Sequence, residues 1–311
     1  MLEQTHPDLD QTRGLFLGLA LGDALGAPFE GGILERGLWK ILGRTRRGEM
    51  RFTDDTQMSL DVFESFVELG GVNGDDLARR FAQSYRWSRG YGPGAARLLK
   101  AIRRGSDWRS ANRSVFASGS FGNGGAMRAP VLAIFLSADR GALNQAARDQ
   151  AEVTHAHPQG IEGAQLIALA AALALERIPE GDTIRELIAS TSSPEYEARL
   201  ECALSWIEAD SNPSPKEVLR QLGCGIAAID SCVTAAYLSI RFRGQPFQSM
   251  VTFAAKMGGD VDTVCAMAGA MWGAARGASA LPQDQLNRLE QRERFENLVN
   301  ELPRQPATHR H

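Results

Sequence analysis

Residues 14–26 read GLFLGLALGDALG, and glycine recurs there at every fourth position: Gly14, Gly18, Gly22 and Gly26. A four-residue step places these positions on one face of an α-helix, so the stretch predicts a helix with a bare glycine face. Each glycine inside a helix costs about 1 kcal/mol relative to alanine, and close contact with a neighbouring helix can offset that cost. Such spacing also favours dimerisation in membranes, but Asp23 and the short length indicate a helix of a soluble protein.

A second glycine face lies near the other end of the chain, in AMAGAMWGAARGA, where Gly269, Gly273 and Gly277 keep the same spacing. Helical periodicity dominates the rest of the chain, and strand-like alternation is scarce. We expect further helices at 54–69, 75–88, 93–104, 124–137, 140–153, 159–176, 181–190, 194–209, 215–222, 227–241, 246–256 and 284–301. The sequence therefore predicts an all-α protein with one compact multi-helix domain over residues 11–302 and flexible termini at 1–10 and 303–311.

Composition limits the classes of function. With 43% hydrophobic and 23% charged residues, the chain of 311 residues is typical of a globular protein. The formal net charge is −3 and no long run of lysine or arginine exists, so we expect no binding to nucleic acid. No uncharged apolar run reaches the roughly 20 residues of a membrane span. We expect no membrane association, and a monomer, because no extended apolar seam is evident.

The cysteines and the N-terminal residues indicate the cellular compartment of the protein. The four cysteines show no zinc-binding spacing and are typical of buried thiols in a reducing compartment: Cys202, Cys224, Cys232 and Cys265. The first residues, MLEQTHPDLDQTRG, contain no apolar segment after a basic start, which indicates no secretory signal. We therefore expect a cytoplasmic protein.

Two pairs of carboxylates carry the strongest chemical signal. Asp54 and Asp55 stand together in FTDDTQMSL (52–60), and Asp260 and Asp262 stand in GGDVDT (258–263), each pair at the expected start of a helix. Helix capping is the simpler interpretation, since aspartate is a common cap. One cap needs one carboxylate, however, and like charges held close raise each other's energy. Hard divalent cations such as Mg²⁺ or Mn²⁺ relieve that repulsion, and with Glu30 the set is able to bridge two ions.

A glycine-rich stretch, GSFGNGGAMR (119–128), has the composition of a loop that holds an anion through backbone amides. It lacks the Lys-Ser/Thr ending of a P-loop, and a tight turn is the simpler alternative. His155 and His157, in THAHP, are two of five histidines. Isolated histidines are more often satisfied polar residues than ligands. We rank His155 above His157, which directly precedes a proline.

Taken in order, GDALG with the later FE (22–30), FTDDTQMSL, GNGGAMR, TH and GGDVDT resemble the ADP-ribosylglycohydrolase family. The resemblance extends over about residues 14–278. It implies an all-α fold with a binuclear magnesium or manganese centre that removes ADP-ribose from modified side chains or small molecules. Its partners would be ADP-ribosylated proteins or molecules that contain ADP-ribose.

The resemblance also implies roles for residues of this sequence. The implied metal ligands are Thr53, Asp54, Asp55, Asp260, Asp262, Thr263 and Glu30. Glu30 matches the catalytic acid, with Asp55 as the alternative. The implied substrate-binding residues are Gly92, Gly119, Ser120, Phe121, Gly122, Asn123, Met127 and His155. The loop 120–123 would hold the pyrophosphate of the ligand.

Two glycine-rich segments, 90–94 and 119–128, look closer to the branch that acts on O-linked ADP-ribose, including serine-linked ADP-ribose, poly(ADP-ribose) and O-acetyl-ADP-ribose. We expect water to attack the anomeric carbon of the distal ribose. The alternatives are an arginine-specific ADP-ribosyl hydrolase and a catalytically dead ADP-ribose-binding relative. A further alternative is a phosphatase, because residues 260–264 fit DxDx[TV]. That chemistry requires the first aspartate at the end of a buried strand.

Overall fold

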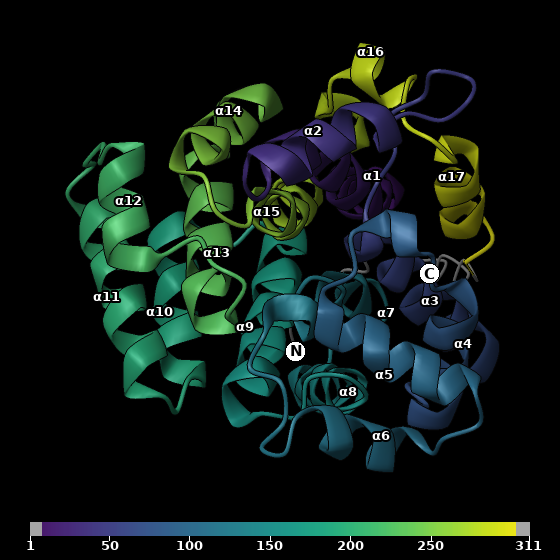
Figure 1. Cartoon of the computed structure of the whole chain (residues 1–311). Coiled ribbons are helices and arrows are strands. Elements are labelled where there is room, and N and C mark those ends of the chain that lie inside the picture. The colour runs from purple at the N-terminus through teal and green to yellow at the C-terminus, as the bar shows by residue number, and fades with distance from the viewer. Residues whose placement is uncertain (1–7, 303–311) are drawn as a thin grey trace, which may run out of the picture.

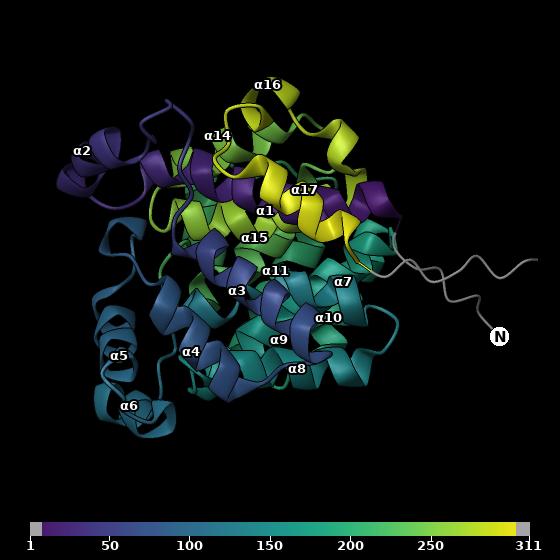
Figure 2. The ribbon, with the colours of Figure 1, turned by 90° about the vertical axis from the view of Figure 1, so that its right-hand side faces the viewer.

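The two glycine faces pack against each other at the centre of the molecule. Helix α1 (Leu9–Gly26) and helix α15 (Val261–Arg276) lie side by side and run antiparallel (Figure 1 and Figure 2). A Cβ atom added at Gly18 would lie 2.3 Å from the carbonyl oxygen of Gly269. One added at Gly273 would lie 1.9 Å from the carbonyl oxygen of Gly14. The expected close helix packing is thus confirmed, and each glycine face is the partner of the other.

The computed structural model describes residues 8–302, and no strand occurs among them. This confirms the all-α prediction. The other helices are α2 (Ile33–Leu42), α3 (Asp54–Leu69), α4 (Gly74–Ser84), α5 (Pro93–Arg103), α6 (Trp108–Val115), α7 (Ala133–Leu136), α8 (Arg140–Glu152), α9 (Pro158–Leu175), α10 (Glu180–Ser190), α11 (Pro194–Glu208), α12 (Pro215–Leu222), α13 (Cys232–Arg241), α14 (Phe247–Met257), α16 (Gln283–Leu286) and α17 (Arg292–Asn300).

Helix α9 lies in the core, against α8, α13 and α15. It is the one helix within residues 8–302 that is long and apolar enough to cross a membrane by length and composition alone. However, 72% of that window is buried inside the protein. Its apolar character is therefore explained by packing against the other core helices.

The structure corrects several expected helices. The expected helix 124–137 is divided into two 3₁₀ turns, Asn123–Gly125 and Ala129–Leu132, followed by α7. Pro130 contributes to this break because it has no N–H for an α-helical hydrogen bond. The expected helix 284–301 is divided into α16 and α17, and Gln291 between them has a left-handed backbone (φ 57°). The first residues of 227–241 form a 3₁₀ turn, and α2 and α6 were not expected.

The start of the domain also differs from the expectation. Helix α1 begins at Leu9, because the side chain of Asp8 accepts a hydrogen bond from the N–H of Asp10 at 2.8 Å and caps the helix. Residues 9 and 10 therefore belong to the first helix and not to a flexible terminus. The remaining parts of the expected flexible termini, 1–7 and 303–311, lie outside the described residues.

Candidate active site

A cavity of about 330 Å³ opens where the starts of α3, α5 and α15 meet the glycine-rich loop 119–128. The antiparallel pairing of α1 with α15 places the end of α1, and Glu30 shortly after it, beside the start of α15. The predicted site residues that line this cavity are Glu30, Asp54, Asp55, Gly92, Ser120, Phe121, Gly122, Asn123, Met127, His155, Asp260, Asp262 and Thr263. Segments far apart in the sequence thus meet in one cavity.

Two predicted site residues are not part of the lining. Thr53 is buried as the N-cap of α3, where its hydroxyl accepts a hydrogen bond from the N–H of Asp55 at 3.3 Å. Gly119 has a left-handed backbone (φ 81°), and a Cβ there would lie 2.3 Å from the backbone nitrogen of His157. Gly119 thus allows the loop to pass close to the segment around His157.

The acidic side chains form two overlapping clusters. Carboxylate oxygens of Asp23, Asp55 and Asp262 lie within 4.8 Å of one another, and so do those of Glu30, Asp260 and Asp262. Burial, followed by the charge of neighbouring carboxylates, raises the pKa of Asp55 and of Asp262 well above the usual range. Asp54 lines the same cavity, and its pKa is raised by the same two causes. The arrangement is electrostatically unfavourable unless protons or cations bind there.

Two buried carboxylate oxygens of these clusters favour cations. Oδ2 of Asp55 and Oδ1 of Asp262 are buried and have no hydrogen-bond partner among residues 8–302. A buried carboxylate oxygen without a partner is costly, and coordination of a cation removes that cost. The clusters contain carboxylates and no cysteine or histidine, a donor set that suits Mg²⁺ or Mn²⁺ better than zinc. The residues present therefore fit a centre of hard divalent cations.

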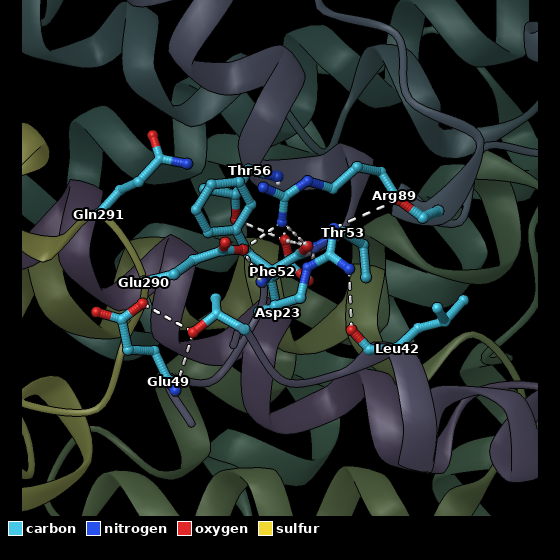
Figure 3. A network of polar contacts seen from close by, with 12 residues as sticks. Asp23, Leu42, Glu49, Phe52, Thr53, Thr56, Arg89, Glu290 and Gln291 are labelled. Atoms are coloured by element: carbon cyan, nitrogen blue, oxygen red, sulfur yellow. Dashed lines mark hydrogen bonds and ion pairs between the residues drawn. The ribbon is translucent and has the colours of Figure 1, made fainter. Parts of the chain in front are cut away.

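Asp23 belongs to the first acidic cluster, although the sequence analysis did not identify it as a site residue. From α1 it accepts hydrogen bonds from the N–H of Thr53 at 2.9 Å and from the hydroxyl of Thr56 at 2.5 Å (Figure 3). It therefore caps the N-terminus of α3 from outside and fixes the start of that helix. Burial raises the pKa of Asp23 to about 6. Its place in GDALG, within a glycine-faced helix, was the one available signal.

A buried ion pair holds Phe52, which lies two residues before Asp54. Arg89 pairs with Glu290, and its guanidinium also donates to the carbonyl of Phe52 at 2.6 Å (Figure 3). Glu290 in turn accepts from the N–H of Phe52 at 2.9 Å. Both backbone groups of Phe52 are thus fixed by side chains from other parts of the chain. Sequence reasoning did not identify this support, because nothing local connects Arg89 to a residue 201 positions later.

The glycine-rich loop is tied to the acidic clusters. Nδ2 of Asn123 donates to Oδ2 of Asp260 at 2.5 Å, and the N–H of Asn123 donates to the carbonyl of Ile226 at 2.9 Å. The N–H of Ala228 donates to the carbonyl of Phe121 at 3.0 Å, so residues 121–123 pair with 226–228. The side chain of Phe121 is 54% exposed at the cavity, which leaves its ring available to a ligand.

Asp61 is expected to make the free energy of unfolding depend on pH. It is buried on α3 beside the hydroxyl of Ser84, and burial raises its pKa to about 7. Between pH 4 and 7 the native state therefore retains a proton that the unfolded state has released, so the free energy of unfolding falls as pH rises through this range. We expect Asp61→Asn to be more stable than the wild type by about 2 kcal/mol above pH 7. Urea unfolding of both proteins at pH 5 and pH 8 measures the difference, and an equal difference at the two pH values would contradict the assignment.

A family model for ADP-ribosylglycohydrolase matches residues 4–311. The chain belongs to the ADP-ribosylglycohydrolase family. It is 32% identical to ADP-ribosylhydrolase ARH3 of Danio rerio, over 88% of this chain and 85% of the relative. It is 30% identical to ADP-ribosylhydrolase ARH3 of Gallus gallus, over 97% of this chain and 95% of the relative.

A solved structure shows the same fold. The chain resembles an ADP-ribosylglycohydrolase-related protein complex with a TM-score of 0.71 and 26% identity, over 94% of this chain and 96% of that one. The family and the helical fold expected from the motifs are therefore confirmed, and membership supports a hydrolase that removes ADP-ribose. The phosphatase interpretation is wrong, because Asp260 precedes a helix and no strand occurs among residues 8–302.

Proposed function

We propose that this ADP-ribosylglycohydrolase releases ADP-ribose from O-linked substrates, with modified serine side chains favoured and O-acetyl-ADP-ribose and poly(ADP-ribose) as further substrates. The main observation in support is that Asp55 and Asp262, each with a buried carboxylate oxygen that has no partner among the described residues, line the same cavity as the glycine-rich loop. The relatives named ADP-ribosylhydrolase ARH3, at 30–32% identity, support the choice of branch.

The proposed cofactors are two divalent cations, Mg²⁺ or Mn²⁺. Their ligands would come from Thr53, Asp54, Asp55, Glu30, Asp260, Asp262 and Thr263. Bound cations of this kind supply Lewis-acid activation of a water molecule and orientation of ribose hydroxyls. The hydroxyl of Thr263 donates to Oδ1 of Asp55 at 3.3 Å, which joins the two predicted ligand motifs directly.

Glu30 is our choice for the group that moves the proton, with Asp55 as the alternative. Glu30 is only half-buried, at the edge of the cavity, and its carboxylate lies within 4.8 Å of those of Asp260 and Asp262. A carboxylate in this position can accept a proton from an attacking water. The transition state of glycoside hydrolysis resembles an oxocarbenium ion, and negatively charged side chains around the anomeric carbon stabilise that positive charge.

The glycine-rich loop would orient the rest of the ligand. Its residues 120–123 line the cavity beside the acidic clusters, and the hydrogen bond between Asn123 and Asp260 fixes the distance between the two parts. We assign the pyrophosphate to this loop and the adenosine to the exposed ring of Phe121, which can stack on a base. Binding the ADP part in this way places the distal ribose toward the carboxylates.

A parallel assay tests the proposal. Purified protein is incubated with serine-linked, arginine-linked and O-acetyl-linked ADP-ribose, each with Mg²⁺ and with EDTA, and free ADP-ribose is quantified. We expect release from the serine and O-acetyl substrates with Mg²⁺ and at least about a hundredfold less with EDTA.

The other outcomes identify the alternatives. Preferred release from the arginine substrate would support the arginine-specific alternative and reject the proposed branch. Tight binding of ADP-ribose in a calorimetric titration, with no turnover of any of the three substrates, would support the catalytically dead alternative.

A further inference from the structure

Arg128 is a buried cation without an ion pair. Its side chain is 0% exposed, and no carboxylate within residues 8–302 forms a salt bridge with it. Its guanidinium instead donates to the carbonyl of Gly124 at 2.6 Å and to the carbonyl of Gln150 at 2.7 Å. Burial lowers its pKa to about 9, so it remains charged at pH 7. Burying a charge is costly unless hydrogen bonds compensate, and Nε of Arg128 also donates to Oε1 of Gln150 at 2.6 Å.

The guanidinium reaches the cavity through one hydroxyl. Nη2 of Arg128 donates to Oγ1 of Thr154 at 3.0 Å, and that Oγ1 lies 2.7 Å from Nδ1 of His155. Thr154 is 1% exposed, and its hydroxyl has no further hydrogen-bond partner among the described residues. His155 lines the ligand cavity. A chain of three side chains thus connects the buried cation to the site.

The chemistry of the three groups fixes the direction of these hydrogen bonds. A guanidinium can only donate, so the Thr154 oxygen accepts from Arg128. The single hydrogen of the Thr154 hydroxyl is then free to donate, and among the described residues Nδ1 of His155 is the one remaining hydrogen-bond partner of that hydroxyl. The arrangement that gives this hydroxyl hydrogen an acceptor leaves Nδ1 unprotonated, and the proton of the neutral ring is then on Nε2. If Nδ1 donated instead, the buried hydroxyl hydrogen would have no acceptor.

The other ring nitrogen faces the glycine-rich loop. A Cβ atom added at Gly124 would lie 2.8 Å from Nε2 of His155, and one added at Gly122 would lie 3.2 Å from it. Nε2 is not among the buried atoms without a partner, although no residue from 8 to 302 hydrogen-bonds to it. It is therefore open to the cavity. Burial and the charge of Arg128 lower the pKa of His155 to about 3, which keeps the ring neutral.

We propose that Arg128 is a positioning residue that acts through Thr154 to hold His155 in its Nε2–H tautomer, as a fixed hydrogen-bond donor to an anionic or hydroxyl oxygen of the ligand. This assignment rests on the proposed function only in naming ADP-ribose as the ligand. In this state His155 cannot accept a proton from water, because Nε2 already carries one and Nδ1 is occupied. The role of His155 is therefore binding, and proton transfer belongs to the carboxylates.

The tautomer can be measured without any substrate. A long-range ¹H–¹⁵N correlation spectrum of the free, full-length protein, labelled with ¹⁵N-histidine, distinguishes the two tautomers from the cation. The signals of His155 are assigned by their loss in His155→Gln. We expect a protonated Nε2 and an unprotonated Nδ1 from pH 5 to pH 8. A protonated Nδ1 in the wild type would overturn the proposal.

Substitutions of Thr154 test whether its hydroxyl sets the tautomer of His155. Thr154→Val keeps the shape and removes the hydroxyl, whereas Thr154→Ser keeps the hydroxyl. We expect Thr154→Val to show a mixture of tautomers and about tenfold weaker binding of ADP-ribose by calorimetric titration, and Thr154→Ser to match the wild type in both. Thr183→Val is the matched control, because Thr183 is a buried threonine on α10 whose hydroxyl donates to the carbonyl of Pro179.

The result separates this inference from the proposed function. An unchanged tautomer, or unchanged affinity for ADP-ribose, in a folded Thr154→Val protein would overturn the role of Arg128 and Thr154. Folding of each variant is checked by its thermal unfolding curve. Neither readout depends on turnover, so a failure to release ADP-ribose from any modified substrate rejects the proposed function and leaves the tautomer measurement valid.

Discussion

Replacing Asp262 by asparagine is expected to remove metal-dependent release of ADP-ribose, with kcat/KM lower by about a thousandfold. Asp262 is the one carboxylate common to both acidic clusters, and its Oδ1 has no partner within the described chain. A neutral amide cannot supply the charge that the two proposed cations would require. We expect Asp54→Asn to lose activity as well, with little loss of fold in either variant.

Stability distinguishes loss of a ligand from loss of the fold. In the presence of EDTA, Asp262→Asn should unfold at a higher temperature than the wild type, because one of several neighbouring negative charges is gone. Mg²⁺ should raise the unfolding temperature of the wild type and have little effect on the variant. Asp284→Asn, at an exposed position on α16, is the control and should behave like the wild type. Near-normal activity in both Asp54→Asn and Asp262→Asn would show that the metal assignment is wrong.

The helical fold could be predicted because its signals are local. Glycine recurs every four residues around Gly18 and again around Gly269, and most other segments show the helical period. Both patterns are visible without tertiary information. The expected helix 54–69 has the same bounds as α3, since Thr53 caps its start and Gly70, in a left-handed conformation, ends it. The error at 124–137 arose because the apolar period continued past Pro130, while the backbone there follows the glycine-rich loop into 3₁₀ turns.

The site could be predicted in part for a different reason. Paired carboxylates at helix starts are conspicuous in a sequence, because a helix cap needs at most one carboxylate. The groups that hold them in place carry no such signal. Asp23 acts across 30 residues on the N–H of Thr53, and Arg89 acts across 201 residues on Glu290. A buried aspartate or arginine of this kind is identified only when the fold shows what it contacts.

Alanine at Gly269 is expected to destabilise the protein by about 3 kcal/mol or more. Its Cβ would lie 2.3 Å from the carbonyl oxygen of Gly18 and 3.1 Å from the carbonyl carbon. These are backbone atoms of a packed helix, so no side-chain rotation relieves the clash, and α1 and α15 must move apart. Because α15 begins at the acidic clusters, the same movement should weaken binding of Mg²⁺. Urea unfolding and the effect of Mg²⁺ on the unfolding temperature measure the two consequences.

Gly37→Ala is the matched control for this substitution. Gly37 is also inside a helix, α2, but a Cβ there would meet no atom of the described side chains and backbone within 4 Å. Helix propensity should then stabilise Gly37→Ala by up to about 1 kcal/mol. The same change of residue is thus expected to have opposite signs at the two positions, and the difference isolates the contact between α1 and α15 from propensity. If Gly269→Ala were as stable as Gly37→Ala, the two glycine faces would not be in the contact described, and the position of Asp262 beside Glu30 would need another cause.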